Sequence, residues 1–187
     1  MRIIAGKARG LKLITPRDLQ IRPTSDRVKE SVFNIIQSNV YDSIIVDLFA
    51  GTGNLGIEAL SRNAKKVYFI DGSKDSVDII KENLAKTNFI SQAEVISGDV
   101  VAGIHKLAEK NVQADIIFMD PPYNKGLALV ALEHIASKKL LNSSGIIVVE
   151  HDKMENMPEE MDIIIRFRRK DYGNTSVSFY KQKEEIK

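Results

Sequence analysis

Short apolar runs alternate with amphipathic stretches through most of this 187-residue chain. The apolar runs predict strands near residues 44–47, 66–71, 94–97, 115–119 and 145–150. The amphipathic stretches predict helices near residues 54–62, 74–86, 100–110 and 126–138. Because repeated strand–helix units build a parallel sheet with helices on both faces, the pattern predicts an α/β fold with a mostly parallel sheet.

The chain begins with a segment that does not follow this alternation. Residues 2–4 and 11–14 are apolar runs around a glycine-bearing loop, and they predict a small β-hairpin. A polar stretch with two prolines follows, and the helical spacing of the apolar residues after it predicts a further helix. We therefore expect two parts, a hairpin with its linker over residues 1–23 and a larger domain over residues 24–187.

The end of the chain also departs from the alternation. Residues 163–167 and 176–180 are strand-like, and no helical pattern separates them. Antiparallel strands at the edge of an otherwise parallel sheet are a common exception in large sheets. The sequence therefore predicts an antiparallel pair at one edge.

The stretch DLFAGTGNLG, residues 47–56, joins the first predicted strand to the next helix. Its three glycines let the backbone approach a ligand that a Cβ would keep away, and the helix directs free N–H groups to the same place. The spacing also fits a dinucleotide fingerprint, but Asp47 would repel a pyrophosphate. Asp47 would instead attract S-adenosylmethionine, which carries a sulfonium and an ammonium group. A tight turn without a ligand is the alternative, although a turn does not require three glycines and an acid.

Three more acids stand at or just beyond the ends of predicted strands. Ligands of open parallel sheets bind outside the carboxyl ends of the strands, which places Asp71, Asp99 and Asp120 on one edge with Asp47. Asp71 lies 20 residues after Gly51, where a carboxylate meets ribose hydroxyls. Asp99 is placed to accept from an adenine amino group, and it could also cap the following helix. The predicted cofactor-binding residues are Asp47, Gly51, Gly53, Asp71 and Asp99.

The stretch Asp120-Pro121-Pro122-Tyr123 carries the predicted chemistry. Successive prolines lack N–H groups, so this loop offers carbonyl oxygens and almost no donors. The Asp120 carboxylate and the Pro121 carbonyl could accept both hydrogens of an exocyclic amine on a base, which frees its lone pair to attack a methyl group. Tyr123 could stack on the face of that base. The alternative is a proline turn that merely ends a strand.

Charge is distributed unevenly along the chain. Residues 1–30 contain eight Lys or Arg and three acids, a charge of +5, whereas the remaining residues sum to −3. This imbalance predicts a basic N-terminal arm that meets phosphate, and a solvated basic edge is the alternative. The predicted RNA-binding residues are Arg2, Lys7, Arg9, Lys12, Arg22 and Arg27.

Composition excludes several other classes of protein. The chain has no cysteine, so it has no disulfide framework and no thiolate metal site. The three histidines, at 105, 134 and 151, lack metal-ligand spacing, and we expect no metal. The first residues lack the apolar core of a signal peptide, and no apolar run approaches membrane-spanning length. We therefore expect a cytoplasmic protein that does not bind a membrane.

The motifs together resemble a known family. DLFAGTGNLGIEALSR followed by DPPY resembles class I S-adenosylmethionine-dependent methyltransferases that act on amino groups. RIIAGKARGLKL and RPTSDRVKESVFN, the latter at residues 22–34, narrow the resemblance to the RsmD family, which methylates the N2 amine of a guanine in small-subunit (16S) ribosomal RNA. The resemblance runs from residue 2 to about 181. It implies a Rossmann-like, seven-stranded sheet with an antiparallel last strand, S-adenosylmethionine as cofactor, and ribosomal RNA in an assembling small subunit as partner.

The resemblance also assigns roles to single residues. It implies that Asp47, Gly51 and Gly53 line the methionine part of the cofactor, that Asp71 meets the ribose and Asp99 the adenine, and that Asp120, Pro121 and Tyr123 hold the guanine amine. The chain departs from the family pattern at Asp71, where relatives often carry glutamate, and at Ala5-Gly6, which replaces a common Gly-Gly.

Four other functions compete with this one. A DNA adenine-N6 methyltransferase uses the same loop chemistry but usually carries a larger target-recognition region. A protein-glutamine-N5 methyltransferase would leave the basic hairpin without a purpose. An NAD-dependent oxidoreductase would explain neither Asp47 nor the Asp120 loop, and a non-catalytic RNA-binding protein would not need that loop.

Overall fold

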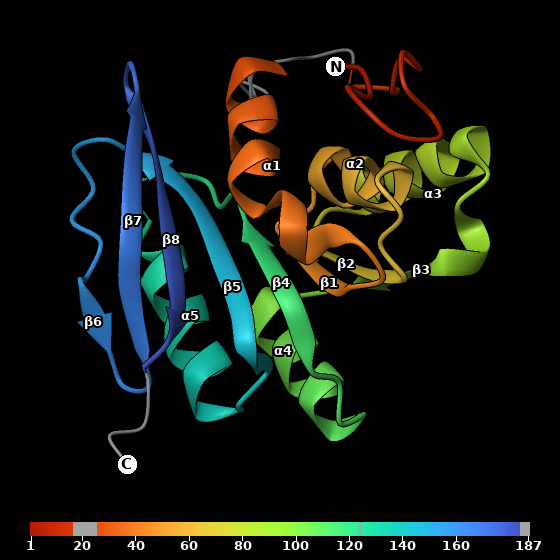
Figure 1. Ribbon diagram of the computed structural model, residues 1–187. Coiled ribbons are helices and arrows are strands. Elements are labelled where there is room, and N and C mark those ends of the chain that lie inside the picture. Colours follow the sequence, from red (N-terminus) through yellow and green to blue (C-terminus); the bar gives the residue numbers. More distant parts are fainter. Residues whose placement is uncertain (17–25, 124, 184–187) are drawn as a thin grey trace.

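The computed structural model describes residues 1–16, 26–123 and 125–183 (Figure 1). The helices in this part of the chain are α1 (Asp26–Val40), α2 (Asn54–Ser61), α3 (Lys74–Thr87), the 3-10 helix η1 (Ile90–Gln92), α4 (Val100–Glu109) and α5 (Leu127–Ser137). The strands are β1 (Ile44–Leu48), β2 (Lys66–Asp71), β3 (Ala93–Ser97), β4 (Ala114–Met119), β5 (Leu141–Asp152), β6 (Glu160–Met161), β7 (Ile164–Tyr172) and β8 (Thr175–Gln182). The predicted α/β alternation is therefore confirmed.

The described strands form one sheet in the order β3-β2-β1-β4-β5-β8-β7-β6. Strands β1 to β5 pair in parallel, and β8 pairs antiparallel with both β5 and β7. The predicted antiparallel last strand is confirmed. The sheet has eight described strands rather than seven, because the two-residue β6 adds to the start of β7. So short a strand carries no periodic apolar signal that a sequence could reveal.

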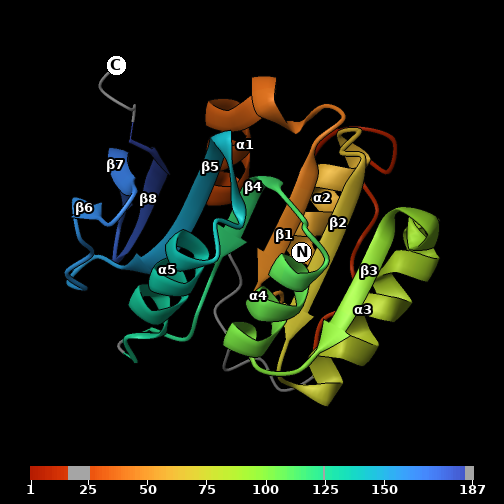
Figure 2. The same cartoon turned by 90° about the horizontal axis from the view of Figure 1, so that it is seen from below.

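Helices cover both faces of the sheet (Figure 2). Helices α1, α2 and α3 pack on one face, where the Phe33 and Phe118 rings lie 5.6 Å apart between centroids. Helices α4 and α5 pack on the other face, around Ile104, Leu132 and Ile135. The central strands are buried on both faces, as their continuous apolar runs require. No described helix is long and apolar enough to span a membrane.

The N-terminal segment folds back on itself as predicted, but its pairing is confined to one antiparallel bridge between Arg2 and Lys12. The backbone N–H groups of Ile4 and Ala5 donate instead to the Glu58 carboxylate on α2, at 2.8 and 3.1 Å. Because these donors turn toward α2, they cannot build a longer ladder. The predicted linker lies largely outside the described residues, and the division of the chain at residue 23 stays a prediction.

Candidate active site

Strand register brings the predicted site acids to one edge of the sheet. Leu48 of β1 lies opposite Met119 of β4, so the glycine loop and Asp120 leave the sheet side by side. Asp71 of β2 lies opposite Ser97 of β3, and the Gly98 N–H donates to the Asp71 carbonyl at 3.0 Å. Asp99 follows directly. The predicted edge of four carboxylates is therefore present.

The glycine loop needs its glycines for two different reasons. Gly51 and Gly53 have φ of +58° and +76°, a left-handed conformation that other residues rarely adopt. A Cβ on Gly51 would meet nothing nearer than the Phe49 carbonyl oxygen at 3.9 Å, so space above the loop is open. A Cβ on Gly56 would lie 2.3 Å from Phe69 Cε1, so this glycine lets α2 pack on β2. The left-handed turn at Gly51 and Gly53 therefore shapes a cradle that is open at Gly51, whereas a Cβ on Gly53 would lie 3.1 Å from a side chain of α2, and Gly56 serves packing.

Asp47 lies beneath this cradle and is only 3% exposed. Its Oδ2 accepts a hydrogen bond from the Gly56 N–H at 2.9 Å. Burial raises the pKa of Asp47 to about 8; the Gly56 hydrogen bond opposes that shift, and the Asp71 carboxylate adds to it. A cation placed in the cradle would restore the ionised form, so the site fits a ligand with an ammonium or sulfonium group.

Asp71 has a structural task that the sequence did not reveal. Its Oδ2 accepts from the Gly51 N–H and its Oδ1 from the Ser73 N–H, both at 2.8 Å. The side chain thus ties the end of β2 to the glycine loop. Each carboxylate oxygen accepts more than one hydrogen bond, so Asp71 keeps acceptor capacity for ribose hydroxyls.

Asp99 caps helix α4, as the alternative interpretation predicted. Its Oδ1 accepts from the N–H groups of Val101 and Ala102 at 2.9 and 3.2 Å. The Oδ2 atom takes part in neither bond. A capping role and a ligand role can therefore coexist in one side chain.

The proline loop after β4 is fixed by contacts from two other strands. Tyr123 donates its O–H to Glu150 Oε1 of β5 at 3.1 Å, and its oxygen lies 3.4 Å from Thr175 Oγ1 of β8. Burial raises the pKa of Tyr123, and the Glu150 carboxylate raises it further, so the phenol stays protonated. Pro121 is buried and Pro122 is exposed. Sequence reasoning missed Glu150 and Thr175, although Glu150 ends its predicted strand with an acid, as Asp71 does.

The predicted RNA-binding residues differ in how far they are engaged. Arg2 forms an ion pair with Asp26, with 3.0 Å between Nε and Oδ2. Arg27 is exposed at the start of α1, whereas Arg22 lies outside the described residues. The predicted side chains that are exposed without a polar partner among the described residues are Lys7, Arg9, Lys12 and Arg27.

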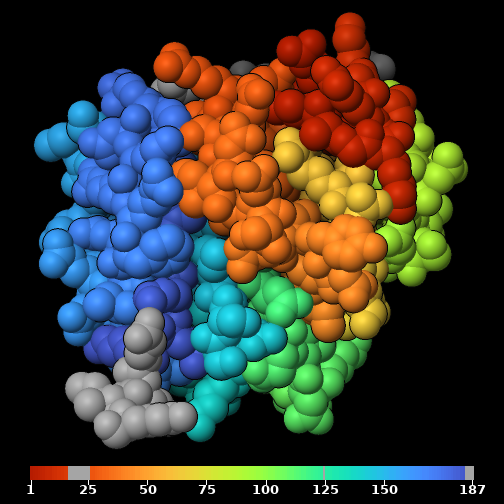
Figure 3. Space-filling view, in the orientation of Figure 1, coloured from red at the N-terminus to blue at the C-terminus, as the bar shows by residue number. Residues whose placement is uncertain are grey.

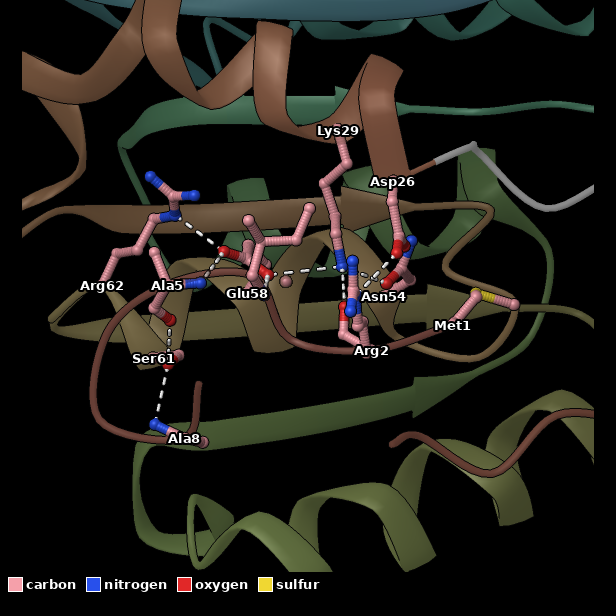
Figure 4. Close-up of polar contacts among 12 residues, drawn as sticks. Met1, Arg2, Ala5, Ala8, Asp26, Lys29, Asn54, Glu58, Ser61 and Arg62 are labelled. Atoms are coloured by element: carbon pink, nitrogen blue, oxygen red, sulfur yellow. Dashed lines mark hydrogen bonds and ion pairs between the residues drawn. The ribbon is translucent and has the colours of Figure 1, made fainter. Parts of the chain in front are cut away.

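A buried polar cluster anchors the N-terminal segment to the helix behind the glycine loop (Figure 4). Lys29 of α1 is fully buried, and its Nζ donates to the Arg2 carbonyl and to Asn54 Oδ1, both at 2.7 Å. The same Nζ lies 3.3 Å from Glu58 Oε2. Glu58, also fully buried, accepts from Arg62 Nε at 2.8 Å. Burial lowers the pKa of Lys29, and Glu58 opposes that shift.

The raised pKa of Asp47 leads to a prediction about stability. An aspartate in the unfolded chain has a pKa near 3.9, whereas that of Asp47 in the folded protein is about 8. Between these two values the unfolded state ionises and the folded state does not, so the wild-type protein loses stability as the pH rises from about 4 to 8. Asp47→Asn removes this loss. We expect the variant to melt at least about 2–4 °C higher than wild type at pH 8, with a smaller gain at pH 5. Thermal denaturation of the ligand-free protein at both pH values measures this effect.

The same substitution should weaken binding of S-adenosylhomocysteine at least about tenfold, because the ammonium group that we expect in the cradle over Asp47 would lose a charged partner. Asp78→Asn, an exposed acid on α3, is the matched control and should change neither quantity. An Asp47→Asn protein that melts below wild type at pH 8 would contradict the conclusion that burial raises the pKa of Asp47 and destabilises its ionised form.

Comparison with solved structures defines the class of protein to which this chain belongs. The structure of the provisionally named methyltransferase YhhF from Escherichia coli is 29% identical and covers 98% of both chains, with a TM-score of 0.86. A glycine loop and a proline loop at one edge of a sheet with an antiparallel last strand accord with this match, and the chain has the Rossmann-like fold of class I methyltransferases.

The family follows from the sequence comparisons. The profile of the family described as Conserved hypothetical protein 95 matches residues 1–181. Ribosomal RNA small subunit methyltransferase D of Haemophilus influenzae is 40% identical over 154 residues, 82% of this chain and 79% of that protein. YlbH of Bacillus subtilis, provisionally named an rRNA methyltransferase, is 36% identical over 98% of this chain and 100% of its own. The chain therefore belongs to this family, the RsmD family, and the resemblance drawn from its sequence is confirmed.

Proposed function

We propose that this protein transfers a methyl group from S-adenosylmethionine to the exocyclic N2 amine of a guanine in 16S ribosomal RNA. The observation that carries the proposal is the fixed loop of Asp120 and Tyr123 beside the cradle over Asp47. The relatives from Haemophilus influenzae and Bacillus subtilis are named for ribosomal RNA methylation, which supports this substrate.

The residues at the edge of the sheet fit the proposed cofactor, which supplies an electrophilic methyl group when bound. Asp47, Gly51 and Gly53 would hold its amino-acid part, because a buried carboxyl below a backbone cradle that is open at Gly51 suits a cationic ligand. Asp71 would accept from the ribose hydroxyls. Asp99 would accept from the adenine amine through the oxygen that does not cap α4.

The loop after β4 would hold the base that is methylated. Asp120 and the Pro121 carbonyl accept the two amine hydrogens, so the nitrogen lone pair is directed at the methyl group. Pro121 and Pro122 contribute no N–H donors that would compete for that lone pair. Tyr123 stacks on the base, and its bond to Glu150 keeps the ring in place. The Asp120 carboxylate stabilises the positive charge that develops on nitrogen.

The basic arm would bind the RNA around that base. Lys7, Arg9 and Lys12 are exposed, and a loop of this charge attracts phosphate. We propose that residues 1–23 form an RNA-binding appendage to the methyltransferase domain. We also place the reaction in the cytoplasm, on RNA within an assembling small subunit.

The test is the methylation pattern of 16S ribosomal RNA from a strain that lacks this protein. We expect mass mapping of nuclease fragments to show the loss of one N2-methylguanosine. Wild-type protein should restore it, and an Asp120→Asn protein should not. Retention of every N2-methylguanosine, or loss of a methylated adenine instead, would overturn the proposed target.

A further inference from the structure

Strand β7 carries a basic and aromatic surface that the proposed chemistry does not use. Phe167 is 44% exposed, Arg168 is exposed and Lys170 is half-buried. Neither Arg168 nor Lys170 has a polar side-chain partner among the described residues. Their neighbours differ, because Arg166 pairs with Glu159 and Arg169 with Asp171. The unpaired cations are therefore confined to one side of the strand.

A β-bulge places Phe167 and Arg168 on the same face of the sheet. The register between β7 and β8 shifts between Arg166 and Arg168, so Phe167 and Arg168 together oppose Phe179. The Phe167 and Phe179 ring centroids lie 6.2 Å apart. Lys170 opposes Val177, which packs in the same core cluster as Phe179. Because directly opposed residues share a face, Phe167, Arg168 and Lys170 form one surface, which we call the β7 strip.

The β7 strip continues onto helix α1 and toward the N-terminal arm. Tyr172, at the end of β7, shares a hydrogen bond with Ser31 of α1, so the helix lies beside the strip. The helix row through Ser31 consists of Arg27, Ser31, Asn34 and Ser38 and contains no acid, although the exposed Glu30 borders it. The space-filling view shows β7, α1 and the N-terminal arm adjoining on one face (Figure 3).

The strip also reaches the candidate active site. Tyr172 opposes Thr175, and Thr175 contacts the Tyr123 hydroxyl. Phe167 stands five residues from Tyr172 along the strand, about 17 Å at the usual rise. The β8 residues on this face, Thr175, Val177, Phe179 and Lys181, include no acid. A chain of phosphates leaving the site could therefore follow the strip without meeting a carboxylate of β8.

We propose that the β7 strip binds a single-stranded segment of the substrate RNA next to the methylated base, with Arg168 and Lys170 on phosphates and Phe167 stacked on a base. This inference rests on the proposed function. An exposed ring flanked by unpaired cations suits an unstacked strand, because base–aromatic stacking requires bases that a duplex keeps paired. The alternative is that the charges only prevent this edge strand from pairing with the sheet of another molecule, but an exposed phenylalanine would promote such pairing.

The experiment measures binding of a 12-nucleotide single-stranded RNA and of the matching RNA duplex by fluorescence anisotropy at several salt concentrations. We expect Arg168→Gln/Lys170→Gln to weaken single-strand binding about tenfold and to reduce the salt slope by about 1.4, which corresponds to two phosphates. Phe167→Ala should weaken single-strand binding at least about fivefold with the salt slope unchanged. Duplex binding should change much less.

Two control variants match these changes elsewhere on the molecule. Lys106→Gln/Lys138→Gln removes the same two charges from exposed positions on the α4 and α5 side of the sheet. Tyr41→Ala removes a ring that is 76% exposed and that lies just after the C-terminal end of α1, away from the β7 strip. Both should bind single-stranded RNA like wild type, and melting temperatures should show that every variant is folded.

The outcomes separate the strip from the proposed function. If the wild-type protein methylates ribosomal RNA and the strip variants bind RNA as tightly as the wild type does, the inference about the β7 strip is wrong and the proposed function still holds. If the double variant instead self-associates in sedimentation while RNA binding is unchanged, the cations protect a sheet edge and the inference is wrong. A wild-type protein that methylates no RNA would overturn the proposed function, whatever the strip binds.

Discussion

Replacing Asp120 with asparagine is expected to slow methyl transfer about 10²–10³-fold, or roughly 2.7–4 kcal/mol in the barrier. The asparagine oxygen can still accept a hydrogen from the substrate amine. It brings no negative charge, however, and the amine nitrogen becomes positive as the methyl group arrives. Preorganised charge of this kind stabilises the transition state more than the ground state, so the rate falls while binding is kept.

The measurement is single-turnover methylation of small-subunit RNA, or of partly assembled subunits, with labelled S-adenosylmethionine. Asp99→Asn is the matched control, because asparagine caps a helix as well as aspartate does and α4 should stay intact. We expect that variant to bind the cofactor more weakly but to react at the wild-type rate at saturation. A wild-type rate for Asp120→Asn would remove Asp120 from the chemistry.

The elements of the central sheet could be predicted because their signals are local. Each parallel strand is a short apolar run, and each helix has its own period, so neither depends on distant residues. The acids at the strand ends followed from one rule about parallel sheets, and the register confirmed that they share an edge. The N-cap at Asp99 was also a local prediction that the structure bears out.

Features that depend on long-range contacts could not be predicted. Tyr123 is held by Glu150 and Thr175, which lie 27 and 52 residues away along the chain. The bulge beside Phe167 exists only because β7 and β8 pair in a shifted register, and no residue type in β7 predicts it. The strand β6 is two residues long and leaves no pattern at all.

The buried Lys29 left a signal that sequence reasoning did not use. Lys29 lies three, four and seven residues before Val32, Phe33 and Ile36, so it occupies the apolar face of α1. A lysine on such a face requires a buried partner. The identity of that partner, Glu58 on α2, depends on how two helices meet and could not be read from either helix alone.

Replacing Glu58 with glutamine is expected to destabilise the protein by about 3–5 kcal/mol, because it leaves the fully buried Lys29 without its carboxylate. The carboxylate of Glu58 now accepts hydrogen bonds from the N–H groups of Ile4 and Ala5 and from the Arg62 guanidinium. In the glutamine variant an N–H₂ group would face some of these donors and could not accept from them. For a chain of this length the melting temperature should fall by about 6 °C or more. Thermal and urea denaturation measure this loss.

Glu94→Gln is the matched control, because Glu94 also meets two cations, Lys66 and Lys110, but at the surface. Exposed pairs contribute little, so that variant should lose no more than about 1 kcal/mol. Adding Lys29→Met to Glu58→Gln should recover part of the stability, since the unpaired buried charge is then gone. Hydrogen exchange at the Ile4 and Ala5 amides should quicken in Glu58→Gln and not in the control. Equal losses in the two single variants would show that the buried cluster does not anchor the N-terminal segment.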